Sequence, residues 1–326
     1  MARSTGRLDA MTTGRSGMRH EAFFYANTAE FVHAMVPFIE EGQQAGESVL
    51  VAVTAPNRLA LRAALAGRLA GVRFVEMESA GRNPGRIISL WRDFVAARNG
   101  HGVRGIGEPV WAGRSKSELV ECQHHETLLN LAFDDGPRWR LVCPYDTTRL
   151  PAAVLDQVRA NHPTVSGARG SAASHSYAPS YRDVLRDPLP PAPAELAGEL
   201  PFELADLPQV RRMVSLLTAP TDASPRRQTD YLTAVNEVAT NSVRYGGGAG
   251  LLRIWWESDG LVTEITDRGV IEAPLVGRMR PTPGPDGGYG LWLVHQLCDL
   301  VQLRSDPASG TVVRMLLRTR VAQPSR

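Results

Sequence analysis

The stretch that decides the fold of the C-terminal half reads YLTAVNEVATNSVRYGGG, from Tyr231 to Gly248. Its apolar residues recur at helical spacing, which predicts an amphipathic helix that ends at three glycines. Glu237 and Asn241 lie one turn apart on the polar flank, so a carboxylate and an amide project side by side. Such a pair suits a general base beside a Mg²⁺ ligand, although the same spacing is common on solvated helix faces. The apolar stripe comprises Leu232, Val235, Val238, Ala239 and Ser242.

Two predicted hairpins follow this helix, with a glycine-rich helix start between them. Asp259-Gly260 is a dipeptide suited to the tight turn of the first hairpin. Gly287, Gly288 and Gly290 open a further predicted helix, where free N–H groups and the helix dipole favour a bound phosphate. The predicted strands are residues 251–257, 261–267, 301–305 and 310–317.

These motifs, in this order, resemble the ATP-binding module of the GHKL superfamily, also called HATPase, which gyrase, MutL and histidine kinases share. Within that superfamily, residues 200–320 are most similar to the anti-sigma-factor serine kinases. The resemblance implies an α/β two-layer sandwich with a Bergerat-type nucleotide site. The motifs are Glu237-x-x-x-Asn241, Asp267-x-Gly269, Gly288-x-Gly290-Leu291 and Gly310-Thr311.

The resemblance also implies roles for individual residues, with ATP and Mg as cofactors. Asn241 is expected to chelate Mg²⁺, and Glu237 to act as a base or to orient the nucleophile. Asp267 is expected to accept from the adenine amino group, with Thr311 nearby. The other expected nucleotide-binding residues are Gly269, Gly287, Gly288, Gly290 and Leu291.

Two positions depart from the family pattern. Tyr245 stands where many relatives carry His, and Ile271 replaces a second glycine after the Asp-x-Gly motif. Neither change removes the expected metal or adenine ligand. They bear on the reaction rate and on the packing of the loop between the motifs more than on nucleotide binding.

Length and composition indicate two globular domains. The chain has 326 residues, is 43% hydrophobic and carries a net charge of +2, which gives no reason to expect a nucleic-acid or membrane partner. Lys116 is its only lysine, so a bound phosphate would be held by backbone N–H groups or by Arg. Three cysteines without a C-x-x-C pair, and an N-terminus without an apolar core, favour a reducing, cytoplasmic location.

Strand and helix patterns alternate through the N-terminal half. This alternation predicts a parallel sheet with helical crossovers, and no G-x-x-x-x-G-K-[ST] motif is present for a P-loop site. Thr28 is a candidate cap of the first helix. The predicted strands are 22–25, 48–53, 72–76, 103–107 and 140–143; the predicted helices are near 28–45, 57–70, 84–100, 117–133 and 151–161.

Polar residues gather at the predicted strand ends of this half, where parallel sheets place ligands. Their combination and order resemble the MEDS sensory domain, over almost all of residues 18–165. The resemblance implies a RecA-like α/β fold without the phosphate loop, and an unknown small-molecule signal. The candidate sensory residues are His20, Tyr25, Arg104, Glu108, Trp111, His125, Glu126, Cys143, Tyr145, Asp146 and His162.

Each of these candidates also has a plain structural interpretation. A His or Cys at a strand end is more often a packing residue than a ligand, and Arg104 with Glu108 could form an ion pair. The His and Cys residues lack the close paired spacing of zinc sites, which argues against a metal there. His125 superficially resembles the acceptor of sensor kinases, but it lies inside an α/β domain.

The chain therefore divides into a disordered tail at 1–17, a sensory domain at 18–165, a linker at 166–198 and a kinase-like domain at 199–320. The linker is rich in Ser, Ala, Gly and Pro, a composition that buries little. We expect a cytoplasmic protein serine kinase, with a STAS-domain anti-sigma-factor antagonist as substrate and a sigma factor as partner. A homodimer stays open. The alternative is a non-catalytic, nucleotide-gated protein that sequesters a sigma factor or another partner; a histidine kinase is disfavoured because no acceptor helix is found.

Overall fold

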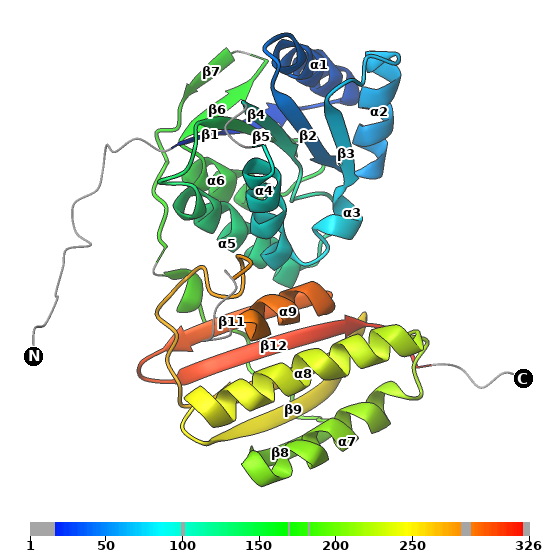
Figure 1. Cartoon of the computed structure of the whole chain (residues 1–326), viewed down its shortest axis with the longest axis vertical. Helices are drawn as coiled ribbons and strands as arrows, with labels where there is room; N and C mark the ends of the chain where they lie inside the picture. The colour runs from blue at the N-terminus through cyan, green and yellow to red at the C-terminus, as the bar shows by residue number, and fades with distance from the viewer. Residues whose placement is uncertain (1–16, 99–101, 169, 182, 282–287, 322–326) are drawn as a thin grey trace, which may run out of the picture.

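The structure is a computed structural model that describes residues 17–98, 102–168, 170–181, 183–281 and 288–321. Two α/β units follow one another along the chain and pack against each other, with helices α5 and α9 near their junction (Figure 1). The tail predicted at 1–17 lies outside the described residues except for Gly17, and so does Gly287. The mixed α/β architecture confirms the predicted fold class, with one mainly parallel sheet and one antiparallel sheet.

The N-terminal unit is built on a seven-stranded sheet in the order β3-β2-β4-β5-β1-β6-β7. Neighbouring strands are parallel except for the antiparallel pair β6–β7 at one edge. Continuous apolar runs form the central strands because both sheet faces are covered, and the bounds predicted for β2, β3 and β4 are confirmed. The strands are β1 Met18–Tyr25, β2 Ser48–Val53, β3 Val72–Glu76, β4 Val103–Gly107, β5 Trp139–Asp146, β6 Thr164–Gly167 and β7 Gly170–Ala173.

Helices separate these strands as the alternating pattern predicts. The first helix is capped by Asn27, whose side chain accepts from the Glu30 N–H, so the expectation of a Thr28 cap is wrong. Ser115 and Glu118 close a capping box at the start of α5. The helices are α1 Thr28–Gln44, α2 Ala55–Leu65, α3 Met77–Ala80, η1 Pro84–Arg86, α4 Ile87–Ala96, α5 Lys116–Ala132 and α6 Ala152–Asn161.

The C-terminal unit is a two-layer sandwich. Its five-stranded antiparallel sheet has the order β11-β12-β10-β9-β8, and helices α7, α8 and α9 pack on one face (Figure 1). Tyr231 on α8 is fully buried, and its hydroxyl donates into this sheet. The elements are β8 Gly198–Glu203, η3 Leu204–Asp206, α7 Leu207–Thr218, α8 Pro225–Tyr245, β9 Ala249–Glu257, β10 Gly260–Asp267, α9 Tyr289–Leu297, β11 Leu300–Asp306 and β12 Gly310–Arg318.

The segment between the two units is only partly irregular. Its first residues form the edge strands β6 and β7, and a short 3-10 turn, η2, follows at Asp183–Leu185. Residues 187–196 then run across the second face of the C-terminal sheet; we call this segment the strap. Arg304 and Arg314 donate to the backbone carbonyls of Asp187 and Pro190. Ala192 and Leu196 pack on an apolar patch made of Trp255, Val262, Leu300 and Leu316.

A buried ion cluster joins the two units. Glu121 on α5 is fully buried, and its carboxylate contacts Arg278 at 2.9 Å and Arg304 at 2.8 Å, both from the C-terminal unit. Although burial opposes ionisation, these arginines and His124 hold the pKa of Glu121 well below its ordinary value. Arg278 belongs to the loop between β10 and α9, so the N-terminal unit contacts that loop directly.

Further contacts extend this junction around helix α9. Asn83, just before η1, donates to the backbone carbonyl of His295 at 2.9 Å, and Trp292 donates to the hydroxyl of Ser89 at 3.1 Å. Gly85 lies so close to His295 that an added Cβ would sit 2.0 Å from the ring nitrogen. The junction is therefore closely packed and specific in its residues.

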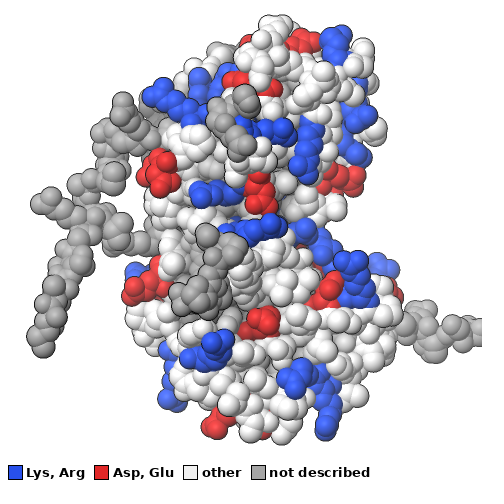
Figure 2. All heavy atoms as spheres, viewed as in Figure 1, with Lys and Arg blue, Asp and Glu red and all other residues white. Residues whose placement is uncertain are grey.

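The surface gives no sign of a dominant charge. Figure 2 shows basic and acidic side chains intermixed on the face that it displays, in keeping with the net charge of +2. Among the described residues, no helix combines the length and the apolar character needed to cross a bilayer.

We predict that Glu121→Gln destabilises the chain by about 3–5 kcal/mol, because Arg278 and Arg304 would keep buried charges without a counter-charge. Urea unfolding of the full chain measures this change. Asp230→Asn is the matched control, since the Arg226–Asp230 pair is solvent-exposed on the arginine side and its loss should cost less than about 1 kcal/mol. Equal losses for the two variants would contradict the role given to Glu121.

Candidate functional site

A cavity of about 490 Å³ lies in the C-terminal unit between α8, the end of β10 and the start of α9. Its volume is in the range of small-molecule sites. The cavity collects the expected nucleotide residues that the structure describes. These are Glu237, Asn241, Asp267, Gly269, Gly288, Gly290, Leu291 and Thr311.

Glu237 and Asn241 form one wall of this cavity. Both side chains are half-buried on α8 and face the start of α9. An added Cβ at Gly290 would lie 3.0 Å from the Glu237 carboxylate and 3.3 Å from the Asn241 amide nitrogen. A larger residue at position 290 would displace these two side chains, and Gly288 caps α9 with a φ of +88°, which favours glycine. The acid, the amide and the glycine turn meet as the motif order predicts.

Asp267 closes the other end of the cavity at the last residue of β10. Its Oδ2 accepts from the Ser242 hydroxyl at 2.6 Å, and its Oδ1 accepts from the Gly269 N–H at 2.7 Å. A carboxylate has about four acceptor positions, so these two bonds do not use all of them. In the sheet register Asp267 pairs with Thr311 on β12, which places the two side by side.

A chain of hydrogen bonds fixes the backbone after Asp267. The Thr311 hydroxyl donates to the Gly269 carbonyl at 2.8 Å, so the Ser305 hydroxyl, 2.8 Å from it, must be the donor to Thr311. Ser305 in turn accepts from the Ile271 N–H at 2.8 Å. Ile271 thus takes part through its backbone N–H. These hydrogen bonds hold the loop at Ile271, the position where the family pattern has a second glycine.

The sequence predicted no site role for Arg244 in the cavity wall, or for Ser242 and Ser305, which form hydrogen bonds with cavity residues. Arg244 lines the cavity one turn after Asn241. It is an arginine of the kind that we expected from the sequence to hold a phosphate in place of lysine. Ser242 and Ser305 orient Asp267 and Thr311. Helical spacing from Asn241 could have indicated Arg244, whereas the serine contacts depend on pairing across the fold. Tyr245, the departure from the family pattern, is 66% exposed at the rim.

Most candidate sensory residues of the N-terminal unit gather in two places, and two of them lie elsewhere. The first is a cavity of about 240 Å³ at the carboxyl ends of the parallel strands. It contains four of the candidates and adds Thr54 and Asn57, which were not predicted. The four candidates are Tyr25, Glu108, Trp111 and Asp146.

Glu108 is the most perturbed acid of this cavity. Its carboxylate accepts from the backbone and hydroxyl of Thr54, both at 2.8 Å, and from the Asn57 amide at 2.9 Å. Burial nevertheless raises the pKa of Glu108 to about 7. A carboxyl of this kind can bind a ligand as a neutral donor near physiological pH.

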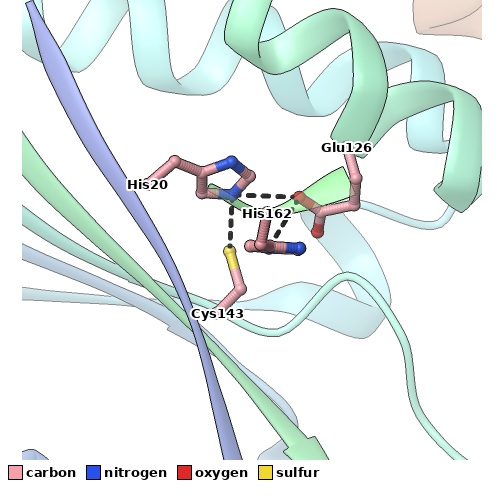
Figure 3. Close-up of side chains that lie close together, drawn as sticks. All are labelled: His20, Glu126, Cys143 and His162. Atoms are coloured by element: carbon pink, nitrogen blue, oxygen red, sulfur yellow. Dashed lines mark hydrogen bonds and ion pairs between the residues drawn. The ribbon is translucent and has the colours of Figure 1, made fainter. Parts of the chain in front are cut away.

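The second place is a buried cluster between the sheet and α5 (Figure 3). His20, Glu126, Cys143 and His162 bring one ligand atom each to within 4.8 Å of one another, although their spacing in the chain argued against a metal site. Burial lowers the pKa of His162 to about 3, so its ring is neutral. Tyr145 belongs to the same cluster, and its hydroxyl donates to Glu126 at 2.8 Å.

Two candidates take other positions. His125 is fully buried on α5, and burial lowers its pKa to about 4, so it is neutral and enclosed. Arg104 contacts Glu47 at 2.5 Å and the Phe38 carbonyl at 2.8 Å, away from Glu108. The expectation of an Arg104–Glu108 ion pair is therefore wrong, and Arg104 braces α1 against the sheet.

Comparison with known proteins identifies both halves. Residues 19–163 match the MEDS family, the methanogen/methylotroph DcmR sensory domain. Residues 200–317 match the family of histidine kinase-like ATPase domains. The chain thus carries a MEDS domain followed by a histidine kinase-like ATPase domain, as the two resemblances implied.

Comparison with whole proteins adds little to this. No curated protein matches the chain. Among solved structures, the chain is similar to the crystal structure of the RsbU and RsbW domains of Rv1364c from Mycobacterium tuberculosis, at 17% identity and a TM-score of 0.28. That similarity covers 39% of this chain and 34% of the other, so the chain spans about a third of that structure's length.

We predict that Glu108 makes the stability of the chain fall as pH rises from about 4.5 to about 7. The folded chain binds an extra proton in this window because the pKa of Glu108 is raised to about 7 from an ordinary 4.5. Glu108→Gln should therefore gain about 3 kcal/mol on the parent between pH 4.5 and pH 8. Unfolding at several pH values measures the difference; a constant difference would contradict the assignment.

Proposed function

We propose that this chain is an ATP-dependent protein serine kinase of the anti-sigma-factor type, controlled by its MEDS domain. The observation that carries the proposal is the meeting of Glu237 and Asn241 with Gly290 at one end of a cavity that Asp267 closes at the other. An acid, an amide and a glycine turn suit the phosphate end of ATP, and a carboxylate with open acceptor positions suits the adenine amine.

The residues of the cavity fit ATP and Mg²⁺. Asp267 is pre-oriented by Ser242 and Gly269, so it can accept from adenine without rearrangement. Asn241 offers a neutral amide oxygen as a metal ligand, and Gly288 and Gly290 offer backbone N–H groups at the start of α9. Bound Mg²⁺ would supply charge neutralisation at the phosphate oxygens.

Glu237 is the residue that distinguishes a kinase from a nucleotide binder in this proposal. Its carboxylate lies at the same glycine turn as Asn241, where an incoming serine hydroxyl would meet the terminal phosphate. A carboxylate there orients the hydroxyl and accepts its proton. Simple nucleotide binding does not need this group.

The junction of the two domains supports control by the MEDS domain. The loop between β10 and α9 carries Ile271 and Val276 in the cavity wall and Arg278 in the buried ion cluster with Glu121. Leu275 and Met279 of the same loop pack against the core of the MEDS domain. A change in the position of α5 would therefore reach the cavity wall through a single loop.

We propose a STAS-domain antagonist of an anti-sigma factor as the phosphate acceptor, and a sigma factor as the regulated partner. Both follow from the kinase type that the C-terminal motifs resemble. A cytoplasmic setting fits three buried cysteines that are free thiols in the structure.

One observation favours a second candidate function. The loop beside the cavity is held by a buried ion pair, which would slow nucleotide exchange. A nucleotide-gated protein that sequesters a sigma factor or another partner would use such slow exchange. Incubation with labelled ATP and candidate STAS proteins separates the two, because only the kinase transfers label.

We predict that Asn241→Ala and Asp267→Ala each weaken Mg·ATP binding by roughly 5- to 150-fold, the equivalent of about 1–3 kcal/mol for an unpaired polar partner. Calorimetric titration of the full chain measures this. Asn236→Ala is the matched control, because Asn236 lies on the same helix but pairs with Arg211 outside the cavity. Unchanged binding in both site variants would overturn the nucleotide site.

For catalysis, we predict that Glu237→Gln keeps ATP affinity within a few-fold but lowers phosphoryl transfer by about 10²–10⁴-fold. The substitution keeps the shape and removes the charge that polarises the hydroxyl. Transfer of labelled phosphate to a STAS substrate measures the rate, and ATP titration of the same sample checks the fold. A fully active Glu237→Gln variant would remove this role, whereas a parent that binds ATP and a partner without transfer would favour the sequestering protein.

A further inference from the structure

The buried cluster in the MEDS domain has the composition and the spacing of a metal site. His20 comes from β1, Glu126 from α5, Cys143 from β5, and His162 directly follows α6 (Figure 3). All four side chains are almost completely buried, and their ligand atoms lie within 4.8 Å of one another. None of them is used in the function proposed above.

The hydrogen bonds around His20 show that its Nδ1 carries a proton. The Asn130 amide nitrogen donates to the carbonyls of Glu126 and Asn161, at 3.1 and 2.8 Å, so the amide oxygen of Asn130 must face His20. That oxygen is 3.0 Å from His20 Nδ1 and can only accept. Nδ1 therefore carries a hydrogen, and Nε2 faces the cluster, where it can bind a cation or carry a second proton.

The same accounting applies to His162. Its Nδ1 lies 2.8 Å from the backbone carbonyl of Val158, which can only accept, so Nδ1 is again the donor. Its Nε2 lone pair also points into the cluster. A histidine whose Nδ1 donates to a carbonyl oxygen and whose Nε2 is free has the tautomer and orientation of a metal ligand.

Glu126 is the acid of this cluster. Its Oε1 accepts from Tyr145, while its Oε2 has no hydrogen bond to a described residue. Oε2 lies 3.1 Å from His20 Nε2 and 3.4 Å from His162 Nε2. A buried carboxylate in this position needs a proton or a cation between these atoms.

We propose that His20, Glu126, Cys143 and His162 bind one Zn²⁺ ion. Bonds of about 2.0–2.3 Å to imidazole, carboxylate and thiolate put tetrahedral ligands about 3.3–3.8 Å apart. The three contacts from His20 and His162 to Glu126 and from His20 to Cys143 measure 3.1, 3.4 and 3.4 Å, close to that range. Four protein ligands, one of them a thiolate, favour Zn²⁺ in a closed site over Mg²⁺ or Ca²⁺.

The order of the strands brings the four residues together, so their spacing along the chain does not reveal the site. β1 and β5 are neighbours in the sheet, and their register pairs Ala22 with Cys143, two residues along from His20. His20 and Cys143 therefore lie on adjacent strands beneath α5. Binding deprotonates the Cys143 thiol and releases that proton to solvent, as zinc does with cysteine ligands.

The first experiment measures metal content and coordination in the full chain. The protein is unfolded with a chelator and refolded with Zn²⁺ or without it, because the ligands are buried and the ion must enter as the chain folds. We expect one tightly held Zn²⁺ per chain and a higher melting temperature for the zinc form. Refolding with Co²⁺ should give intense visible bands of tetrahedral coordination and a near-ultraviolet thiolate-to-cobalt band.

Variants then assign the ligands. Cys143→Ser should lose the thiolate-to-cobalt band, and His162→Gln should lose at least about tenfold in Zn²⁺ affinity. Cys122→Ser is the matched control, because Cys122 is a buried thiol on α5 that donates to the Pro109 carbonyl at 3.2 Å. It should keep the band and the affinity.

The outcomes decide the proposal even if a variant fails to fold. A parent that refolds equally well without Zn²⁺, retains none after dialysis and gives only octahedral cobalt bands would overturn it, leaving a shared proton in the cluster. Loss of the thiolate band in Cys122→Ser but not in Cys143→Ser would also overturn the ligand assignment. These tests are independent of ATP binding, so they stand or fall apart from the kinase.

Discussion

The buried carboxylate of Glu121 is the contact on which the arrangement of the two domains depends. It lies on α5 of the MEDS domain and neutralises Arg278 and Arg304 of the ATPase domain. Buried charges of this kind are tolerated only when their partners are in place. The contact between the domains therefore also holds the loop that carries Arg278. The same loop forms part of the wall of the C-terminal cavity, which Ile271 and Val276 line.

Helix α5 carries acidic side chains that contact both domains. Glu118 and Glu121, three residues apart, face the ATPase domain, where Glu118 contacts Arg318 at 2.8 Å. Glu126 faces the opposite way, into the cluster with His20. Five residues of helix span about 7.5 Å, so the two ends of this path are within one rigid element. Glu126 in the cluster and Glu121, which contacts Arg278, therefore lie on one helix with no intermediate side chain between them.

Local patterns predicted the parts of the fold that local physics determines. The bounds of β2 and β4 follow from runs buried on both sheet faces, and the residues of the C-terminal cavity follow from a motif whose spacing reflects one helix and two turns. The buried cluster could not be predicted in the same way. Cys143 lies near His20 only because β5 is the neighbour of β1, and strand order is a property of the whole sheet. The pairing of Glu121 with Arg278 likewise joins residues from separate domains, with no signal in either segment.

The strap at residues 187–196 changes what counts as the ATPase domain. It covers Trp255, Val262, Leu300 and Leu316 on the sheet face opposite α7, α8 and α9, and it receives hydrogen bonds from Arg304 and Arg314. A fragment that begins at Leu200, where the family match begins, would leave this apolar face open to water and to other copies of itself. The segment that packs together as the ATPase domain therefore begins before the residues that match the family.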